Sequence, residues 1–174
     1  MKNRFLLLLA AAAASGAPAR LALAPTQAIS KSAVRDELMA VHDAWDAART
    51  GFDGAAFERM LAPDFWVQIG PQKMTREQFI ALISQRQPGA LLKRFESDIL
   101  TLTRSGDAWE AVVEEKLEVE LTGPDGKAQT GYSLWITKDR FRKDGERWLV
   151  LSSEAVGTES WGGGATPPFD DWSS

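Results

Sequence analysis

Four long segments in the second half of the chain alternate apolar and polar residues, and short turns that contain glycine separate them. Alternation with a period of two is typical of β-strands that bury one face. Short glycine-bearing turns join neighbouring strands in antiparallel order. We therefore expect an antiparallel meander, with its four strands inside residues 91–107, 108–126, 127–145 and 146–157.

The part of the chain before this meander is expected to be mostly helical. Apolar residues recur every three or four positions from Ala33 to Gly51, which predicts an amphipathic helix. A second helix is expected from Gly54 to Leu61, with Asp53 as its N-cap residue. Helices followed by long strands predict an α+β fold, in which the helices cover one face of a curved antiparallel sheet.

A short strand and a third helix are expected between these two parts. The strand lies in residues 63–71, between two prolines. Thr75 can cap the third helix, with Gln78 as its capping-box partner, and Pro88-Gly89 should end it.

Three segments carry a resemblance to a known family. Their most specific positions are Trp45, the pair Asp64-Phe65 and an Asp-Gly-x-x-Trp pattern that ends at Trp148. On these positions and on the order of the elements, residues 32–156 resemble the nuclear transport factor 2-like superfamily, especially its SnoaL-like and domain-of-unknown-function branches. The segments are DAWDAARTGFDGAAFERMLAPDFWVQIG, MTREQFIALI and WITKDRFRKDGERWLVLSSEAV.

The resemblance implies a cone-shaped sheet covered by three N-terminal helices, a cystatin-like α+β roll, with an apolar pocket between the concave face and the first helix. It does not determine an activity, because the superfamily includes isomerases, cyclases, dehydratases, epoxide hydrolases and non-enzymatic binding proteins. Ketosteroid isomerases in it have a tyrosine on the first helix and an aspartate near the start of the first strand. Here the helix offers His42 and Trp45, and the strand offers Trp66 and Gln68.

The chain is expected to begin with a secretory signal peptide, because a Lys/Arg-bearing start is followed by an apolar run and small residues. Cleavage after Ala19, Ala24 or Ala28 fits the pattern, so the mature protein should be exported, either to a periplasm or into the medium. The expected parts are a signal peptide at 1–24, a linker at 25–31, the domain at 32–157 and a flexible Gly/Pro-rich tail at 158–174.

Composition excludes several classes of site and partner. The chain has no cysteine and one histidine, so it can form neither a disulfide nor the usual zinc ligand sets. It lacks phosphate-loop and dinucleotide motifs, and we expect no metal and no cofactor. A net charge of −4 without a basic cluster argues against nucleic acid or an anionic membrane as a partner.

Glu115 is the first candidate for a catalytic residue, because it interrupts the apolar face of its strand. If the following turn pairs Leu121 with Ala128, Tyr132 lies diagonal to Glu115 on the same face. A buried carboxyl could then act as a base and the phenol as a hydrogen-bond donor. The other interpretation is a strand end where Glu115 reaches solvent or pairs with an arginine, and a turn register that differs by one residue would also separate Tyr132 from Glu115.

His42 is the second candidate, since it lies beside the apolar stripe of the first helix, one turn before Asp46. Asp46 could orient the imidazole for proton transfer. A boundary histidine with a surface partner is the simpler interpretation.

Several apolar residues are expected to form the pocket wall. The tail tryptophans, Trp161 and Trp172, are expected in an irregular segment. The candidate ligand-binding residues are Trp45, Trp66, Val113, Leu117 and Leu134.

Three functions are compatible with the sequence. The leading hypothesis is an exported protein that binds a small hydrophobic molecule in the cone pocket. The second is an isomerase, cyclase or dehydratase that needs no cofactor. The third is a protein-binding module, or a homodimer, that uses the outer sheet face where charged residues alternate: Glu114, Lys116, Glu118 and Glu120.

Overall fold

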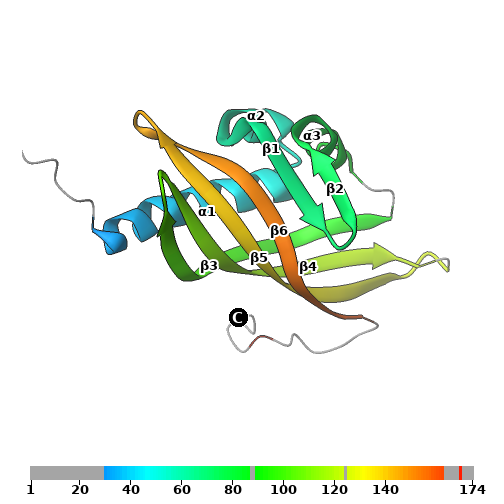
Figure 1. Cartoon of the computed structure of the whole chain (residues 1–174). Coiled ribbons are helices and arrows are strands. Elements are labelled where there is room, and N and C mark those ends of the chain that lie inside the picture. The colour runs from blue at the N-terminus through cyan, green and yellow to red at the C-terminus, as the bar shows by residue number, and fades with distance from the viewer. Residues whose placement is uncertain (1–29, 87–88, 124, 163–168, 170–174) are drawn as a thin grey trace, which may run out of the picture.

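The computed structural model describes residues 30–86, 89–123, 125–162 and 169 (Figure 1). The predicted signal peptide and most of the linker lie outside the described residues, as do residues 163–168 and 170–174 of the predicted tail, Trp172 among them. Among the described residues, no helix combines the length and the hydropathy needed to cross a bilayer.

Three helices form where the sequence predicts them. The Ser30 side chain accepts a hydrogen bond from the Ala33 N–H at the start of the first helix. The predicted capping box is confirmed, because Thr75 and Gln78 each accept a hydrogen bond from the other's backbone N–H. The third helix ends at Ile83, earlier than predicted. The helices are α1 (Lys31–Gly51), α2 (Gly54–Met60) and α3 (Arg76–Ile83).

A single six-stranded sheet has the order β2-β1-β6-β5-β4-β3. The predicted meander is confirmed as β3 to β6, whose neighbours are all antiparallel. β1 instead pairs with β6 in parallel, so the sheet is mixed rather than antiparallel throughout. The strands are β1 (Leu61–Ile69), β2 (Gln72–Thr75), β3 (Ala90–Ser105), β4 (Ala108–Thr122), β5 (Ala128–Asp144) and β6 (Arg147–Trp161).

Strand β2 was not predicted from the sequence. The chain reverses at Gly70, which has a φ of +57° that glycine adopts without strain, and at Pro71. The four residues that follow then pair antiparallel with β1.

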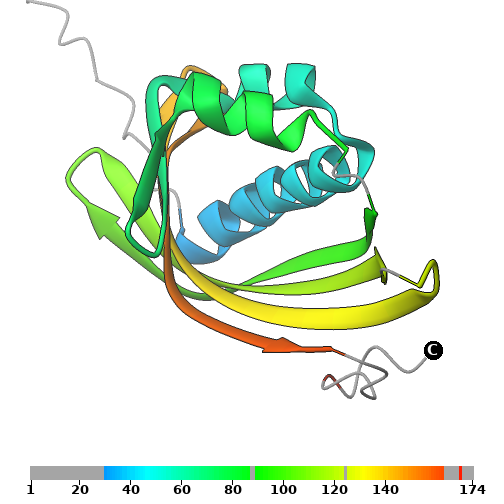
Figure 2. The same cartoon turned by 90° about the vertical axis from the view of Figure 1, so that its right-hand side faces the viewer.

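The sheet curves around α1, which lies on its concave side (Figure 2). Helices α2 and α3 lie beside the β1–β2 hairpin (Figure 1). One continuous apolar core fills the space between these layers. Burial of each large core side chain contributes about 1.5–3 kcal/mol. The largest fully buried side chains are Phe57, Phe141, Leu38, Ile99, Val34, Val113 and Val150.

The predicted register between β4 and β5 is wrong by one residue. It paired Glu115 with Leu134, whereas Glu115 lies opposite Trp135 and Glu118 lies opposite Tyr132. The loop is shorter than expected, because it closes with a backbone hydrogen bond of 2.8 Å from the N–H of Gly123 to Lys127 within the loop. Since a one-residue shift exchanges the two faces of a strand, Tyr132 is on the opposite face from Glu115.

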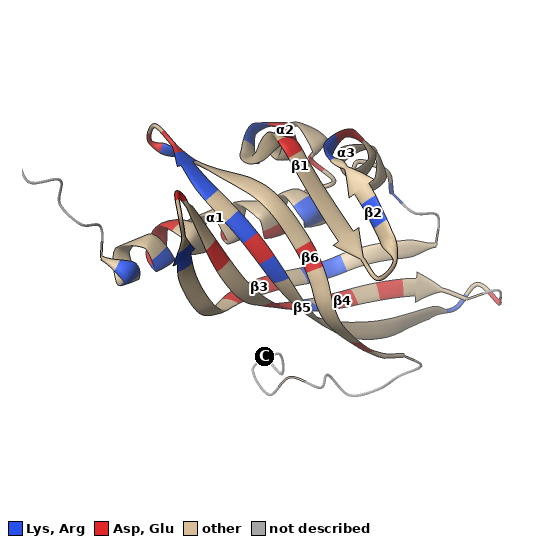
Figure 3. Cartoon of the chain, in the orientation of Figure 1, with Lys and Arg blue, Asp and Glu red and all other residues tan. Residues whose placement is uncertain are grey.

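Charged residues of both signs recur along the strands of the sheet (Figure 3). Those at alternate positions of β4, from Glu114 to Glu120, lie on its outer face. β6 reaches Trp161, beyond the predicted domain end at residue 157, and Trp161 pairs with Tyr132 of β5. Phe169 packs on this face against Tyr132, and the partly buried Leu134 packs against the same small cluster.

Candidate functional site

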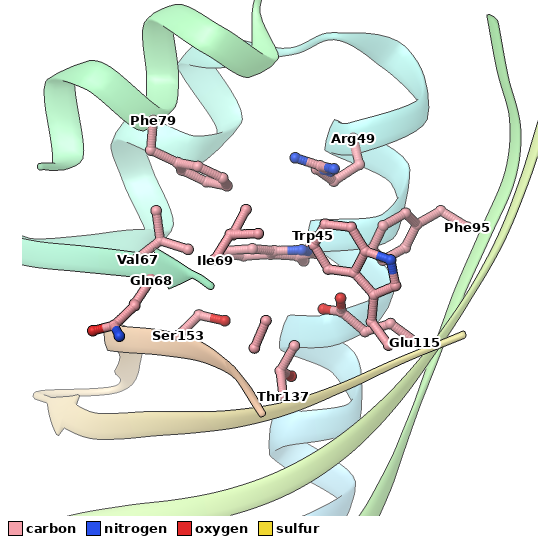
Figure 4. A pocket seen from close by; sticks show the side chains of 12 residues that line it. Trp45, Arg49, Val67, Gln68, Ile69, Phe79, Phe95, Glu115, Thr137 and Ser153 are labelled. Atoms are coloured by element: carbon pink, nitrogen blue, oxygen red, sulfur yellow. The ribbon is translucent and has the colours of Figure 1, made fainter. Parts of the chain in front are cut away.

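A narrow cavity, named the deep cavity here, opens between α1, β1, α3 and the concave face of the sheet (Figure 4). Its volume is about 30 Å³. That volume has room for roughly two water molecules. It is lined by Trp45, Arg49, Val67, Gln68, Ile69, Phe79, Phe95, Glu115, Trp135, Thr137, Ser153 and Ala155.

Glu115 contributes a carboxyl group to this cavity from the middle of β4. It is only 4% exposed and lies on the inner face of the strand, where the alternation of the sequence predicts it. Burial raises the pKa of Glu115 to about 8; the nearby Asp139 raises this pKa further, and Arg49 opposes the rise. The carboxyl therefore holds a proton near neutral pH and can donate a hydrogen bond.

Asp139 and His42 form a buried pair behind the cavity. Nε2 of His42 lies 3.8 Å from Oδ2 of Asp139, and each residue is 3% exposed. Burial raises the pKa of Asp139 to about 7, while the neighbouring hydroxyls of Ser153 and Thr137 act to lower it. Burial lowers the pKa of His42 to about 4. The imidazole is therefore neutral at pH 7, and its ring meets Phe141 edge-on, with centroids 5.5 Å apart.

Asp46 makes no hydrogen bond to the imidazole of His42, contrary to the prediction. Its Oδ1 accepts a hydrogen bond of 2.7 Å from the Ser97 hydroxyl on β3. Burial raises the pKa of Asp46 to about 7, although the hydrogen bonds from Ser97 oppose this. The simpler interpretation of His42 as a boundary residue is also wrong, because His42 is buried.

Arg49 lies one turn further along α1, with its guanidinium between two aromatic rings. Its Cζ is 5.9 Å from the ring centroid of Phe79 and 5.3 Å from that of Phe95. Burial lowers the pKa of Arg49, whereas Glu115 and Asp46 raise it. Such cation–π contacts stabilise a desolvated guanidinium by about 0.5–2 kcal/mol.

A second, larger cavity adjoins the first at the open mouth of the cone. Its volume is about 480 Å³, and its lining is mostly apolar. Arg49 lines both cavities and is, among the described residues, the one that they share. The mouth cavity is lined by Arg49, Phe52, Leu82, Ile83, Gln85, Ala90, Leu92, Leu117 and Val119.

Among the described residues, no group of three or more histidine, cysteine, aspartate or glutamate side chains is arranged to hold a metal ion. The side chains of the candidate site are acids, one neutral histidine, one arginine and aromatic walls.

No family model and no curated protein matches this sequence. Solved structures match it along nearly their whole length. A nuclear transport factor 2-like protein from Cytophaga hutchinsonii aligns with a TM-score of 0.53 and 17% identity, over 71% of this chain and 97% of its own. A nuclear transport factor 2-like superfamily protein from Salmonella enterica aligns with a TM-score of 0.55 and 11% identity, over 82% and 99%. This chain has the nuclear transport factor 2-like fold.

A conserved protein from Planctomyces limnophilus aligns equally well, with a TM-score of 0.55 and 17% identity over 68% of this chain and 93% of its own. At such identities, the nuclear transport factor 2-like fold is what the structures share. What the cone binds depends on the residues that line it.

The nuclear transport factor 2-like cone brings together only some of the predicted site residues. Trp45 lines the deep cavity and Leu117 lines the mouth. Val113 is fully buried in the core. Trp66 lies on the β1–β2 hairpin, with Nζ of Lys73 3.7 Å from its ring centroid.

The prediction that Tyr132 and Leu134 lie in the cone pocket is wrong, because both residues belong to the outer-face cluster with Phe169. The shifted β4–β5 register removes them from the cone interior. The predicted hydrogen-bond donor of the acid–base site is therefore not beside Glu115.

Sequence reasoning missed Asp139 and Arg49. Asp139 lies between Lys138 and Arg140 in the sequence, so it resembles one more charged residue on an exposed strand. Arg49 could have been found, because it follows His42 by seven residues and so continues the same helix face.

Proposed function

We propose that this protein binds a small molecule with an apolar body in the interior of its cone. The observation that carries the proposal is the pair of adjoining cavities, which aromatic and aliphatic side chains line for the most part. The mouth cavity, at about 480 Å³, has the size of typical ligand sites. Polar groups are few, as expected for a site where they orient the ligand.

The proposal is tested by blocking the mouth cavity. Leu92 on β3 lines it, so the Leu92→Glu variant should place a charge where the apolar body would lie. We expect lipophilic compounds to raise the melting temperature of the wild-type protein and to have no such effect on Leu92→Glu. Leu100→Glu, on the same strand but exposed, should respond like the wild type.

Two outcomes would reject binding in the cone. One is that no compound of a lipophilic panel stabilises the wild-type protein. The other is that Leu92→Glu and Leu100→Glu respond alike, because the compounds would then bind elsewhere.

Acid–base catalysis on a carbonyl compound is a second candidate function, as in an isomerase, cyclase or dehydratase. One observation favours it: Glu115 lines the deep cavity and its pKa of about 8 suits proton transfer near neutral pH. The readout is deuterium exchange at the carbon next to a ketone. Exchange that survives in Glu115→Gln would reject this function, and Glu118→Gln, on the same strand, is the matched control.

We also propose that the protein is exported by means of its N-terminal segment and that it self-associates through the outer sheet face. Glu118 and Glu120 make that face polar, which suits a weak rather than an obligate dimer. Light scattering across a range of concentrations tests self-association, and N-terminal sequencing of the mature protein tests cleavage.

A further inference from the structure

We propose that the ligand of the cone is an amphiphilic organic anion, whose carboxylate is held by Arg49 and whose apolar body fills the mouth cavity. This inference rests on the proposed function and adds the chemical class of the ligand. Three observations support it: the position of Arg49, the absence among the described residues of a hydrogen-bond or ion-pair partner for its guanidinium, and the character of the surrounding groups.

The position of Arg49 is the first observation. Arg49 lies where the deep cavity meets the mouth cavity and lines both of them. Figure 4 shows its side chain at the edge of the deep cavity, above the ring of Trp45. A ligand that enters through the mouth therefore reaches this guanidinium at the inner end of an apolar space.

The second observation concerns the bonding of Arg49. A guanidinium carries five N–H donors in a planar fork that matches a carboxylate. Among the described residues, Arg49 makes aromatic contacts with Phe79 and Phe95 but no hydrogen bond within 3.5 Å and no ion pair within 4.0 Å. A bound carboxylate would supply the missing partner in a two-pronged hydrogen-bonded pair.

The third observation is that burial shifts the acids which interact with Arg49 towards their neutral, protonated form. Glu115 and Asp46 are the acids that interact with it, and burial favours the protonated form of both. One cation without a charged partner selects a ligand with one negative charge. The aliphatic mouth, with Leu92, Leu117 and Val119, selects an apolar body.

Decanoate and 1-decanol form the matched ligand pair for the test, since they differ only in the charged group. Binding of each to the full chain is measured by quenching of tryptophan fluorescence and by calorimetry. We expect decanoate to bind the wild-type protein about tenfold more tightly than decanol, a difference of about 1.4 kcal/mol, because a charge-assisted pair is stronger than a neutral hydrogen bond. Equal affinities would overturn the assignment of an anion while leaving the proposed function intact. Failure of both ligands to bind would count against the proposed function itself.

Two variants separate ligand binding by Arg49 from a structural role. Arg49→Gln should weaken decanoate binding about tenfold and leave decanol binding unchanged, and Arg49→Lys should recover part of the loss. Arg86→Gln is the matched control, because Arg86 stacks over Phe52, a residue of the same mouth, with 5.3 Å from its Cζ to the ring centroid. If Arg49→Gln weakens both ligands equally, or if Arg86→Gln has the same effect, the inference is wrong. Should Arg49→Gln fail to fold, Arg49→Lys and the wild-type comparison decide the question.

Discussion

Glu115 lowers the stability of the folded protein as the pH rises. Its folded pKa of about 8 is above its ordinary value of 4.5, so folding takes up a proton between these pH values. The stability it contributes is fully present below pH 4.5 and is lost as the pH rises through about 8. Asp139 and Asp46 act in the same direction, since burial raises both of their pKa values to about 7.

Replacement of Glu115 by glutamine should therefore increase the free energy of unfolding most at alkaline pH. We expect the free energy of unfolding of Glu115→Gln, relative to the wild type, to rise by at least about 1 kcal/mol between about pH 5.5 and about pH 8. Urea denaturation at the two pH values measures this change. Glu118→Gln, on the outer face of the same strand, should show no such trend. A constant difference between Glu115→Gln and the wild type would show that Glu115 titrates normally.

His42 should titrate near pH 4, because its burial disfavours the imidazolium. The effect on stability has the opposite sign from that of the acids. The stability linked to His42 is present above pH 6.5 and is lost as the pH falls through about 4. Proton NMR gives the pKa directly, since the chain contains one histidine. A pKa above 6.5 that falls in Asp139→Asn would instead indicate a charged pair with Asp139.

At the residue scale, the alternation along β4 was enough to place Glu115 inside the cone. It was not enough to find the neighbours of Glu115, because these lie on another strand and depend on the register. The same limit applies to His42. The helical period identified Asp46 as a neighbour along the helix, but Asp139 approaches from β5, which no local pattern could indicate.

At the scale of elements, α2 and α3 approach each other closely at Gly54. A Cβ atom on Gly54 would overlap the Ser84 hydroxyl, which donates a hydrogen bond of 2.7 Å to the Ile80 carbonyl. Alanine has a better helix propensity than glycine by about 1 kcal/mol. Propensity and packing therefore oppose each other at this position.

A double-mutant cycle can separate the two effects. Gly54→Ala alone should destabilise the protein, because Ser84 must move. In a Ser84→Ala background the same change should be neutral or should stabilise the protein by up to about 1 kcal/mol. Thermal denaturation of the four proteins measures the coupling. Equal effects of Gly54→Ala in both backgrounds would mean that Ser84 is not the obstacle.

Elements that are defined locally were predicted well from the sequence. The caps at Asp53 and Thr75 and the glycine turns of the meander act within a few residues of each other, so they can be read directly. The loop between β4 and β5 was harder, because two registers that differ by one residue both suit a glycine-rich turn. In the observed register the N–H of Gly123 donates a hydrogen bond to the Lys127 carbonyl and closes the loop.

At the scale of the whole molecule, Phe169 returns to cover the outer face of the sheet. It is 8% exposed and packs on Tyr132, which is 9% exposed. Phe169→Ala should uncover Tyr132, so we expect tetranitromethane to nitrate this residue several times faster. Mass spectrometry measures the rate on the one tyrosine of the chain. Val156→Ala, an exposed apolar position on β6, should react at the wild-type rate, and an unchanged rate in Phe169→Ala would contradict the contact.

The α+β class was predictable from the order of the elements, and the cone followed from the resemblance to the nuclear transport factor 2-like superfamily. The parallel pairing of β1 with β6 was not, because those strands are separated by most of the domain and no short motif links them. Non-local pairing of this kind depends on the summed packing of the core rather than on any one stretch of sequence.

The place of β6 between β1 and β5 also affects how the chain folds. β6 is the last strand of the described chain, yet it joins the β1–β2 hairpin to the rest of the sheet. During synthesis, β1 of the hairpin cannot pair with β6 until almost the whole domain has been made. Contacts between such distant segments slow folding, because a long loop has to close first. Interruption of synthesis within β6 would therefore leave β1 with an unpaired edge, a known starting point for aggregation.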